Sequence, residues 1–311
     1  MAAITPPFTD ARDAAASLRR QGTDVKGQTF RWFLVGALSL ALLTLLALVW
    51  DMWAEGSNVL LARPVQFLTS GLNTNVEMAG VWQGIKGSLM LGLIVAIVSF
   101  PIGIGAAVYL EEYAGNTRFA RIVEINIRNL AGVPSIVYGL LGLAIFVQAL
   151  GGVTGGRTVI AGGLTLAALV LPIVIITSQE ALRAVPAGIR EGALALGATR
   201  WESIRHHVMP AATPGILTGT VLSLARALGE AAPLLVVGAV TGVFFAGASG
   251  FFEQIYAGRF TALPMVIFNW ARQPGPEWLQ LTGAASLILV ALIVVMNGFA
   301  IFLRNRYERK W

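Results

Sequence analysis

Two ionisable residues lie deep inside an apolar run of membrane length, residues 215–240. Arg226 and Glu230 are four positions apart, a spacing that places both side chains on one face of a helix. Ser223 and Thr220 continue that face as a weakly polar stripe. An arginine near the bilayer centre costs roughly 2.5–3.5 kcal/mol on insertion scales, so such residues are functional candidates by default. A planar guanidinium binds tetrahedral oxyanions in a bidentate manner. The pattern therefore predicts an anion site within the membrane, with Glu230 balancing the charge when the site is empty.

The alternative interpretation of this pair is a salt bridge that neutralises itself and fixes helix packing. A buried ion pair is often no more stable than an apolar replacement of similar volume, so stability alone explains the pair poorly. Pro233 follows and cannot donate to the carbonyl of Gly229, which leaves an acceptor free near Glu230. We therefore favour the functional interpretation.

A second candidate region is the polar stretch 180–212. Its residue types predict a helix, a left-handed glycine turn and a short helix that begins with a capping box and ends at a proline. The residues that mark these points are Pro186, Gly197, Thr199, Glu202 and Pro210.

One apolar face is expected on the short helix of this stretch. Trp201, Ile204 and Val208 follow helical spacing, whereas the neighbouring positions are charged or polar. Such a face suits a groove in another protein. The alternative is that Trp201 packs onto this chain's own helices or lies at the lipid interface. The adjacent His206 and His207 do not face each other on a helix, so no metal site is expected there.

Composition identifies a membrane protein. The 311 residues are 56% hydrophobic and 12% charged, about half the charge of a soluble domain, and the apolar residues come in runs of about 20. There is no cysteine, hence no disulfide or thiol nucleophile. No phosphate-binding glycine loop of the GxxxxGK[ST] type occurs, so ATP chemistry must come from another subunit, and no cofactor is expected. No Ser/His/Asp set or HExxH pattern suggests an enzyme.

Six apolar runs predict an all-α, polytopic fold with six transmembrane helices. We expect a tail over 1–31, a retained first anchor over 32–51, a core over 82–304 that includes the loop 180–212, and a tail over 305–311. The predicted spans are residues 32–50, 87–110, 129–150, 158–178, 215–240 and 281–303.

The basic residues predict the orientation. Most of the 22 Lys and Arg residues fall in one set of loops and in both tails; the opposite loops hold only Arg63, Arg157, Arg259 and Arg272. Cytoplasmic loops collect Lys and Arg, so both termini and the loop 180–212 are expected in the cytoplasm. The net charge of +6 is explained by this topology and does not indicate nucleic-acid binding.

The loop 180–212 resembles the cytoplasmic "EAA" loop of the permease subunits of ABC importers. The residues that carry the resemblance are Glu191, Ala193, Gly197 and Pro210, and the sequence departs from that pattern at Gly192, His207 and Met209. The resemblance implies the fold of type I importer permeases (MetI-like) and a short helix seated in a cleft of a separate ATPase subunit. It assigns coupling to the ATPase to Glu191, Ala193, Gly197, Thr199, Trp201, Glu202, Ile204 and Pro210.

A narrower resemblance covers about residues 67–311. Residues 226–235, Arg-Ala-Leu-Gly-Glu-Ala-Ala-Pro-Leu-Leu, are similar to a signature of the A-type (PstA-type) permease subunits of high-affinity phosphate importers, with Ala231 where threonine is usual. Residues 129–139, 260–264 and 296–307 are also similar to that family. This resemblance implies inward phosphate transport across a bacterial plasma membrane, a heterodimer with the C-type permease subunit, an ATP-binding subunit dimer and an extracytoplasmic phosphate-binding protein.

Three rival functions remain open at this point. The chain could be the sister phosphate permease subunit, a permease of the same fold for sulfate or molybdate, or a membrane scaffold that senses phosphate.

Overall fold

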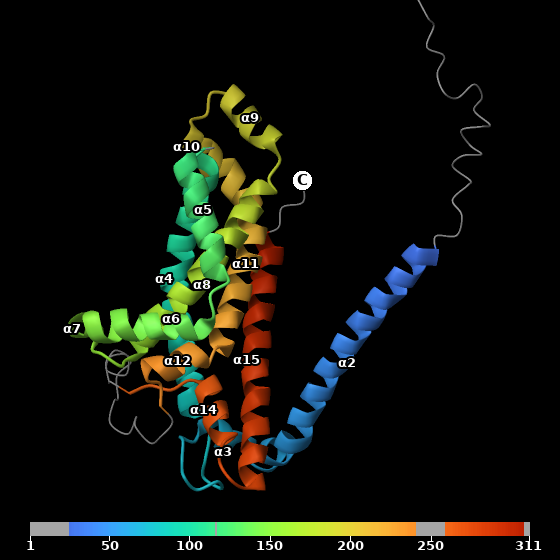
Figure 1. Ribbon diagram of the computed structural model, residues 1–311, viewed down its shortest axis with the longest axis vertical. Coiled ribbons are helices and arrows are strands. Elements are labelled where there is room, and N and C mark those ends of the chain that lie inside the picture. Colours follow the sequence, from blue (N-terminus) through green and yellow to red (C-terminus); the bar gives the residue numbers. More distant parts are fainter. Residues whose placement is uncertain (1–24, 116, 241–258, 308–311) are drawn as a thin grey trace, which may run out of the picture. The chain divides into compact units, whose positions relative to one another are not determined.

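The computed structural model describes residues 25–115, 117–240 and 259–307, over which all regular structure is helical (Figure 1). The chain divides into two units, Met1–Asp51 and Met52–Trp311. Residues 1–24 of the expected N-terminal tail and residues 308–311 of the expected C-terminal tail lie outside the described residues.

The first predicted span lies within a longer helix. Helix α2 covers Val25–Ala62 and thus extends beyond both ends of the expected anchor at 32–51. After α2 comes a short helix, α3 (Pro64–Thr69), with proline in its first turn. The stretch between the first predicted span and the second is therefore largely helical as far as residue 69.

The described residues contain six candidate spans of an all-α membrane fold when one bent pair of helices is counted as a span. Five helical runs in the described residues are long and apolar enough to cross a bilayer. They are α2; α4 (Trp82–Val108) with the π-helical turn η1 (Tyr109–Tyr113); α8 (Val159–Arg183); the run of α10 (Arg200–Ser203), η3 (Ile204–Val208) and α11 (Met209–Gly229); and α15 (Pro276–Tyr307).

The expectation of a single helix over 129–150 was wrong. Helix α5 (Arg118–Ala131) and the pair α6 (Ser135–Gly142) and η2 (Leu143–Ala149) are bent by 102°. Pro134 has no N–H for the ladder and pushes the residue before it away from helical geometry. Tyr138 lies after the break, and its hydroxyl donates to the carbonyl of Leu130 at the end of α5, 2.9 Å away.

The expectation of one helix over 215–240 was also wrong. Helix α11 ends at Gly229, Glu230 is extended (φ −84°, ψ 113°), and α12 (Ala232–Val237) starts a new direction. Pro233, in the first turn of α12, has no N–H to donate to a carbonyl of α11, and the start of a helix is the position that proline favours. The charged pair therefore sits at a helix end.

The predicted helix stop at Pro210 is absent. The helix runs through this proline from Arg200 to Gly229, and the π-helical turn η3 directly precedes α11, whose second residue is Pro210. A π turn replaces the i→i+4 hydrogen bonds of an α-helix by i→i+5 bonds. The N–H that Pro210 lacks is therefore missing at a point where the α-helical hydrogen bonds are already interrupted.

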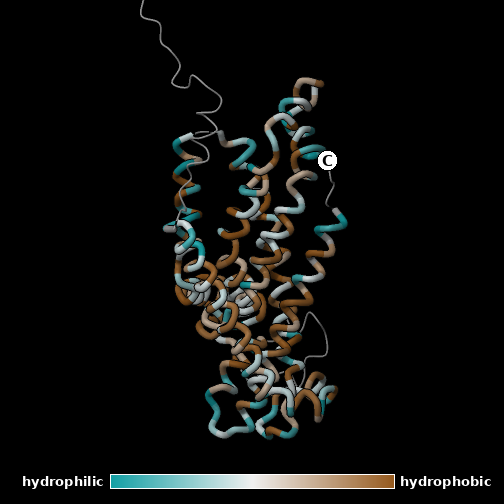
Figure 2. The backbone as a smooth tube through the Cα atoms, turned by 90° about the vertical axis from the view of Figure 1, so that its right-hand side faces the viewer, coloured by the Kyte–Doolittle hydropathy of each residue, from teal (hydrophilic) through white to brown (hydrophobic). Residues whose placement is uncertain are grey.

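Three buried clusters hold the second unit together, with α8 at the centre. One joins α4, α8, α11 and α12; one joins the end of α2 with α3, α14 (Leu263–Trp270) and α15; one lies where α8, η3 and α11 meet. Figure 2 shows apolar residues gathered over the middle of the bundle and hydrophilic ones towards its ends. Close helix contact depends on small residues: a Cβ on Gly103 of α4 would lie 2.6 Å from Val174 Cγ1 of α8.

Two short helices complete the described elements. Helix α7 (Gly151–Thr154) follows η2, and α9 (Ala187–Ala195) lies at one end of the bundle beside α10 (Figure 1). We call residues 184–203, which contain α9 and α10, the tip segment.

Candidate functional site

Arg226 and Glu230 form a loose ion pair at the end of α11. The Arg226 Nε to Glu230 Oε1 distance is 3.5 Å, and the two side chains are 49% and 22% exposed. Charge-assisted hydrogen bonds between such groups are about 2.7–2.9 Å long. Glu230 thus neutralises the guanidinium without saturating it, which leaves N–H groups available to an anion.

The predicted polar stripe is not formed. Thr220 and Ser223 are buried, and their hydroxyls donate to carbonyls of their own helix, those of Leu217 and Gly219. Of the four residues expected at the anion site, the structure brings together only Arg226 and Glu230. The helix break explains part of this result: Glu230 has left the helical path on which the stripe was drawn.

The break itself adds to the chemistry of this site. Discontinuous helices in transporters place free backbone groups beside the transported ion. Glu230 and Ala231 lie between the end of α11 and the start of α12. The site therefore combines an open guanidinium, a countercharge and backbone that is not committed to a helix.

The tip segment has the predicted local structure. Gly197 follows α9 with φ +87°, a conformation that favours glycine. The Thr199 N–H donates to Glu202 Oε2 at 2.8 Å, and the Glu202 N–H donates to Thr199 Oγ1 at 3.3 Å. This capping box starts α10 and is confirmed.

The expected apolar docking face is divided. Ile204 is 1% exposed and Val208 fully buried, both facing the chain's own core, whereas Trp201 is exposed. Ile204 therefore supports the helix from inside. The apolar surface of the tip consists instead of Trp201 with two leucines that sequence analysis missed, Leu194 and Leu196, the latter 90% exposed.

The remaining residues expected to couple to the ATPase differ in their exposure to solvent. Glu191 and Pro210 are exposed, and Ala193 is buried against the chain. Exposed Leu196 adjoins Gly197 in the sequence, so the turn displays an apolar side chain directly before the glycine. That adjacency is a sequence signal that could have identified the leucine.

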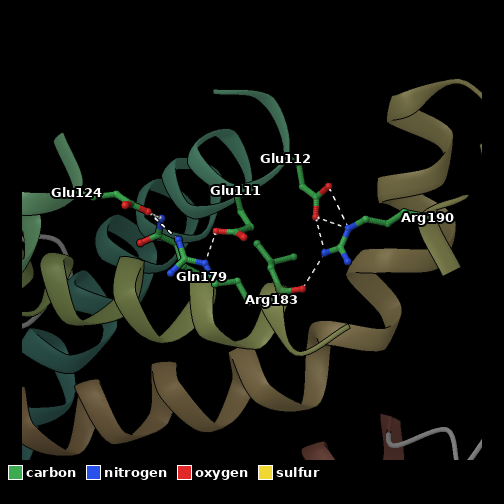
Figure 3. A network of polar contacts seen from close by, with 7 residues as sticks. Glu111, Glu112, Glu124, Gln179, Arg183 and Arg190 are labelled. Atoms are coloured by element: carbon green, nitrogen blue, oxygen red, sulfur yellow. Dashed lines mark hydrogen bonds and ion pairs between the residues drawn. The ribbon is translucent and has the colours of Figure 1, made fainter. Parts of the chain in front are cut away.

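A polar network lies at the base of the tip segment and was also missed (Figure 3). It connects Arg183 with Glu111 and Glu124, and Arg190 with Glu112. Because its partners are far apart in sequence, spacing gave no signal for it. Over the described part of the chain, no group of three or more Asp, Glu or His side chains is arranged to hold a metal ion.

Comparison with known proteins identifies relatives. Residues 99–311 match the family model described as "Binding-protein-dependent transport system inner membrane component". The chain is 36% identical over 231 residues to the "Phosphate transport system permease protein PstA" of Mycobacterium leprae, covering 74% of this chain and 72% of that protein. It is 33% identical to the protein of the same name from Yersinia pestis, covering 87% of this chain and 90% of that protein.

Solved structures show the same fold. The chain resembles a bacterial alginate ABC transporter with a TM-score of 0.57 at 15% identity, covering 92% of this chain and 98% of that chain. It resembles an inward-facing MetNI methionine ABC transporter with a TM-score of 0.54 at 18% identity, covering 74% of this chain and 95% of that chain. The type I permease fold expected from sequence is confirmed.

Proposed function

This chain belongs to the family of binding-protein-dependent transport system inner membrane components, among the PstA-type permeases, and on that premise we propose that it carries inorganic phosphate into a bacterial cell. In this proposal the chain is a non-catalytic, multi-pass subunit of the plasma membrane with both termini in the cytoplasm. The energy comes from ATP hydrolysis in a separate subunit.

The observation that carries the proposal is the open Arg226–Glu230 pair at the end of α11. Nearly half of the arginine side chain is exposed although it lies in a membrane-length helical run. Attraction between a guanidinium and an anion is stronger in a low-dielectric cavity than in water. Phosphate would bind the free N–H groups of Arg226 while Glu230 moves away, and the loose 3.5 Å pair makes that exchange inexpensive.

The partners follow from the surfaces that this chain leaves open. The exposed side of Arg226 supports a pathway completed by a second permease subunit, which we assign as the C-type phosphate permease. Trp201, Leu194 and Leu196 on the tip segment supply apolar side chains for a groove of the ATP-binding subunit. A phosphate-binding protein would deliver the anion at the opposite end.

Uptake of radiolabelled phosphate tests the proposal. A strain lacking this chain should lose high-affinity uptake, and a plasmid copy should restore it. Excess sulfate or molybdate should not compete with phosphate. Unchanged uptake in the deletion strain would refute the proposal.

Uptake, together with the transcriptional response to phosphate and complementation by the sister subunit, separates the rival functions. Inhibition by sulfate or molybdate would instead indicate a permease for another oxyanion. Intact uptake with lost transcriptional response to phosphate in tip-segment variants would indicate a sensing scaffold. If the sister subunit restored uptake equally well in the deletion strain, the assignment to the A-type subunit would be wrong.

A further inference from the structure

Three consecutive residues of the π-helical turn η1 each contact a different arginine. Glu111 pairs with Arg183 at the end of α8, Glu112 with Arg190 of α9, and the Tyr113 ring lies 5.3 Å from the guanidinium carbon of Arg200 of α10. Consecutive helical side chains point in different directions, so one turn reaches three elements. π turns occur frequently at functional sites.

The contact between Arg190 and Glu112 is the strongest of the three. Nη2 donates to Glu112 Oε1 at 2.7 Å, Nε donates to Oε1 at 3.0 Å and to Oε2 at 3.3 Å, and the carboxylate side chain is only 8% exposed. Two-pronged pairs of this kind fix geometry as well as charge. A buried carboxylate that lost its partner would be strongly destabilised, so the structure depends on this pairing.

Arg190 also connects to the end of α8. Its Nη1 donates to the carbonyl of Val185 and its Nη2 to that of Leu182, both at 2.8 Å. Terminal carbonyls of a helix lack partners within the helix and attract positive charge. One side chain on α9 therefore holds both the last turn of α8 and the extension of α4.

The two outer contacts are weaker but extend the connection. Arg183 donates to Glu111 Oε2 at 2.8 Å and to Glu124 Oε1 of α5 at 2.7 Å. These groups line an open cavity of about 270 Å³, where solvent screens them. Arg200 and Tyr113 are both exposed. The connection through Glu112 is therefore the one that solvent weakens least.

We propose that η1 is the point at which the tip segment is fixed to the transmembrane bundle, with Arg190 and Glu112 as the positioning pair. In this arrangement the tip segment and the ends of α4 and α8 move as one body, so displacement of the tip by a partner reaches the membrane helices without loss. The inference rests on the proposed function for the cargo and for the ATP-binding subunit as the partner that displaces the tip. The pair does not contact the cargo.

The distance between the tip and η1 gives a test that does not depend on the cargo. The chain has no cysteine, so spin labels can be placed at Tyr109→Cys and Gly188→Cys, both exposed positions, in the assembled complex with cysteine-free partners. If the tip segment and η1 move as one body, the distribution of distances between the two labels should be narrow and should be the same without nucleotide and with ATP. A shift on ATP binding in the otherwise unmodified chain would overturn the proposal.

Variants of the pair extend the test to transport. Arg190→Gln and Glu112→Gln should broaden the distance distribution and lower phosphate transported per ATP hydrolysed by about tenfold, the effect expected from losing a charged hydrogen bond. Arg190→Lys keeps the positive charge but not the two-pronged guanidinium, so we expect an intermediate loss of phosphate transported per ATP hydrolysed. If Arg190→Gln does not fold, Arg190→Lys provides the test in its place. Arg118→Gln is the control, because it removes an exposed arginine at the start of α5 that has no ion pair among the described residues.

The outcomes separate this inference from the proposed function. Co-purification with the ATP-binding subunit should survive in all variants, because the exposed leucines and Trp201 remain. A purely structural role would lower the melting temperature and the yield but leave the transport ratio of the assembled complex unchanged, which would overturn the inference. An unmodified complex that hydrolyses ATP without moving phosphate would overturn the proposed function, while the spin-label distances would still decide the inference.

Discussion

Arg226 and Ser223 are three residues apart on α11 but face different environments: the arginine side chain is 49% exposed, whereas Ser223 is 1% exposed. The serine hydroxyl is satisfied by the carbonyl of Gly219, 2.8 Å away. The exposed side of the helix therefore presents the cation, and the buried side holds the helix against its neighbours. Substitutions at the two positions should affect different properties.

Replacing Arg226 by glutamine should lower phosphate uptake by at least about tenfold, because the variant lacks the charged hydrogen bond that we propose Arg226 makes to the anion. Ser223→Ala should leave uptake within about twofold, since its hydroxyl bonds only within the helix. Initial uptake rates in cells with equal amounts of each variant measure both effects. Normal uptake by Arg226→Gln with full assembly would eliminate the anion role.

Replacing Gly197 by valine should disturb the turn between α9 and α10. The left-handed conformation at φ +87° costs a residue with a Cβ roughly 1–2 kcal/mol. We expect weaker co-purification with the ATP-binding subunit and less stimulation of its ATPase. Gly192→Ala is the matched control: this glycine lies within α9, a Cβ there meets nothing within 4 Å, and alanine favours the helix by about 1 kcal/mol. Equal behaviour of the two variants would contradict the role of the turn.

Leu196→Ser should impair binding to the ATP-binding subunit, whereas Ile204→Ala should impair the stability of the chain. Leu196 is exposed and Ile204 buried. The first change should weaken binding to the ATP-binding subunit without altering the melting temperature of the chain. The second removes buried methyl groups and should cost about 2–5 kcal/mol of stability. Thermal unfolding in detergent and co-purification, measured on both variants, distinguish the two effects; a stability loss in Leu196→Ser would show that the leucine packs inside.

Gly103→Leu should separate α4 from α8. A Cβ at this position already approaches Val174 Cγ1 to 2.6 Å, and overpacking of this kind costs about 1–3 kcal/mol. Gly105→Ala, two residues along the same helix, meets nothing within 4 Å and should raise stability by about 0.5–1 kcal/mol. The melting temperatures of the two variants should therefore move in opposite directions from that of the unmodified chain.

The fold class was predictable because a bilayer constrains length and composition together. Apolar runs of about 20 residues have few alternatives to a spanning helix. Pro134 and Pro233 mark the two breaks by residue type, but the apolar runs 129–150 and 215–240 predict a continuous span through each of them. Whether a proline bends or ends a membrane helix depends on side-chain contacts that hydropathy does not specify, such as the hydrogen bond from the Tyr138 hydroxyl to the Leu130 carbonyl across the break at Pro134.

The candidate sites were only partly predictable for a related reason. The capping box of Thr199 and Glu202 is local and was correct. The split of the apolar face into exposed Trp201 and buried Ile204 was not predicted, because helical periodicity does not say whether an apolar side chain packs against this chain or against a partner. The contact between Arg190 and Glu112 joins residues 78 positions apart, and one sequence offers many arginine–glutamate pairs from which to choose.

In the proposed function, the continuous helical run from Arg200 to Gly229 would transmit motion from the tip segment to Arg226. From Arg200 to Arg226 it measures about 39 Å at 1.5 Å per residue. If it pivots near one end, a tilt of about 10° displaces the other end by about 7 Å, more than the width of a phosphate ion. If the tip segment binds the ATP-binding subunit as proposed, a small rotation of this helix at Arg200 would therefore move the Arg226 guanidinium by several ångströms.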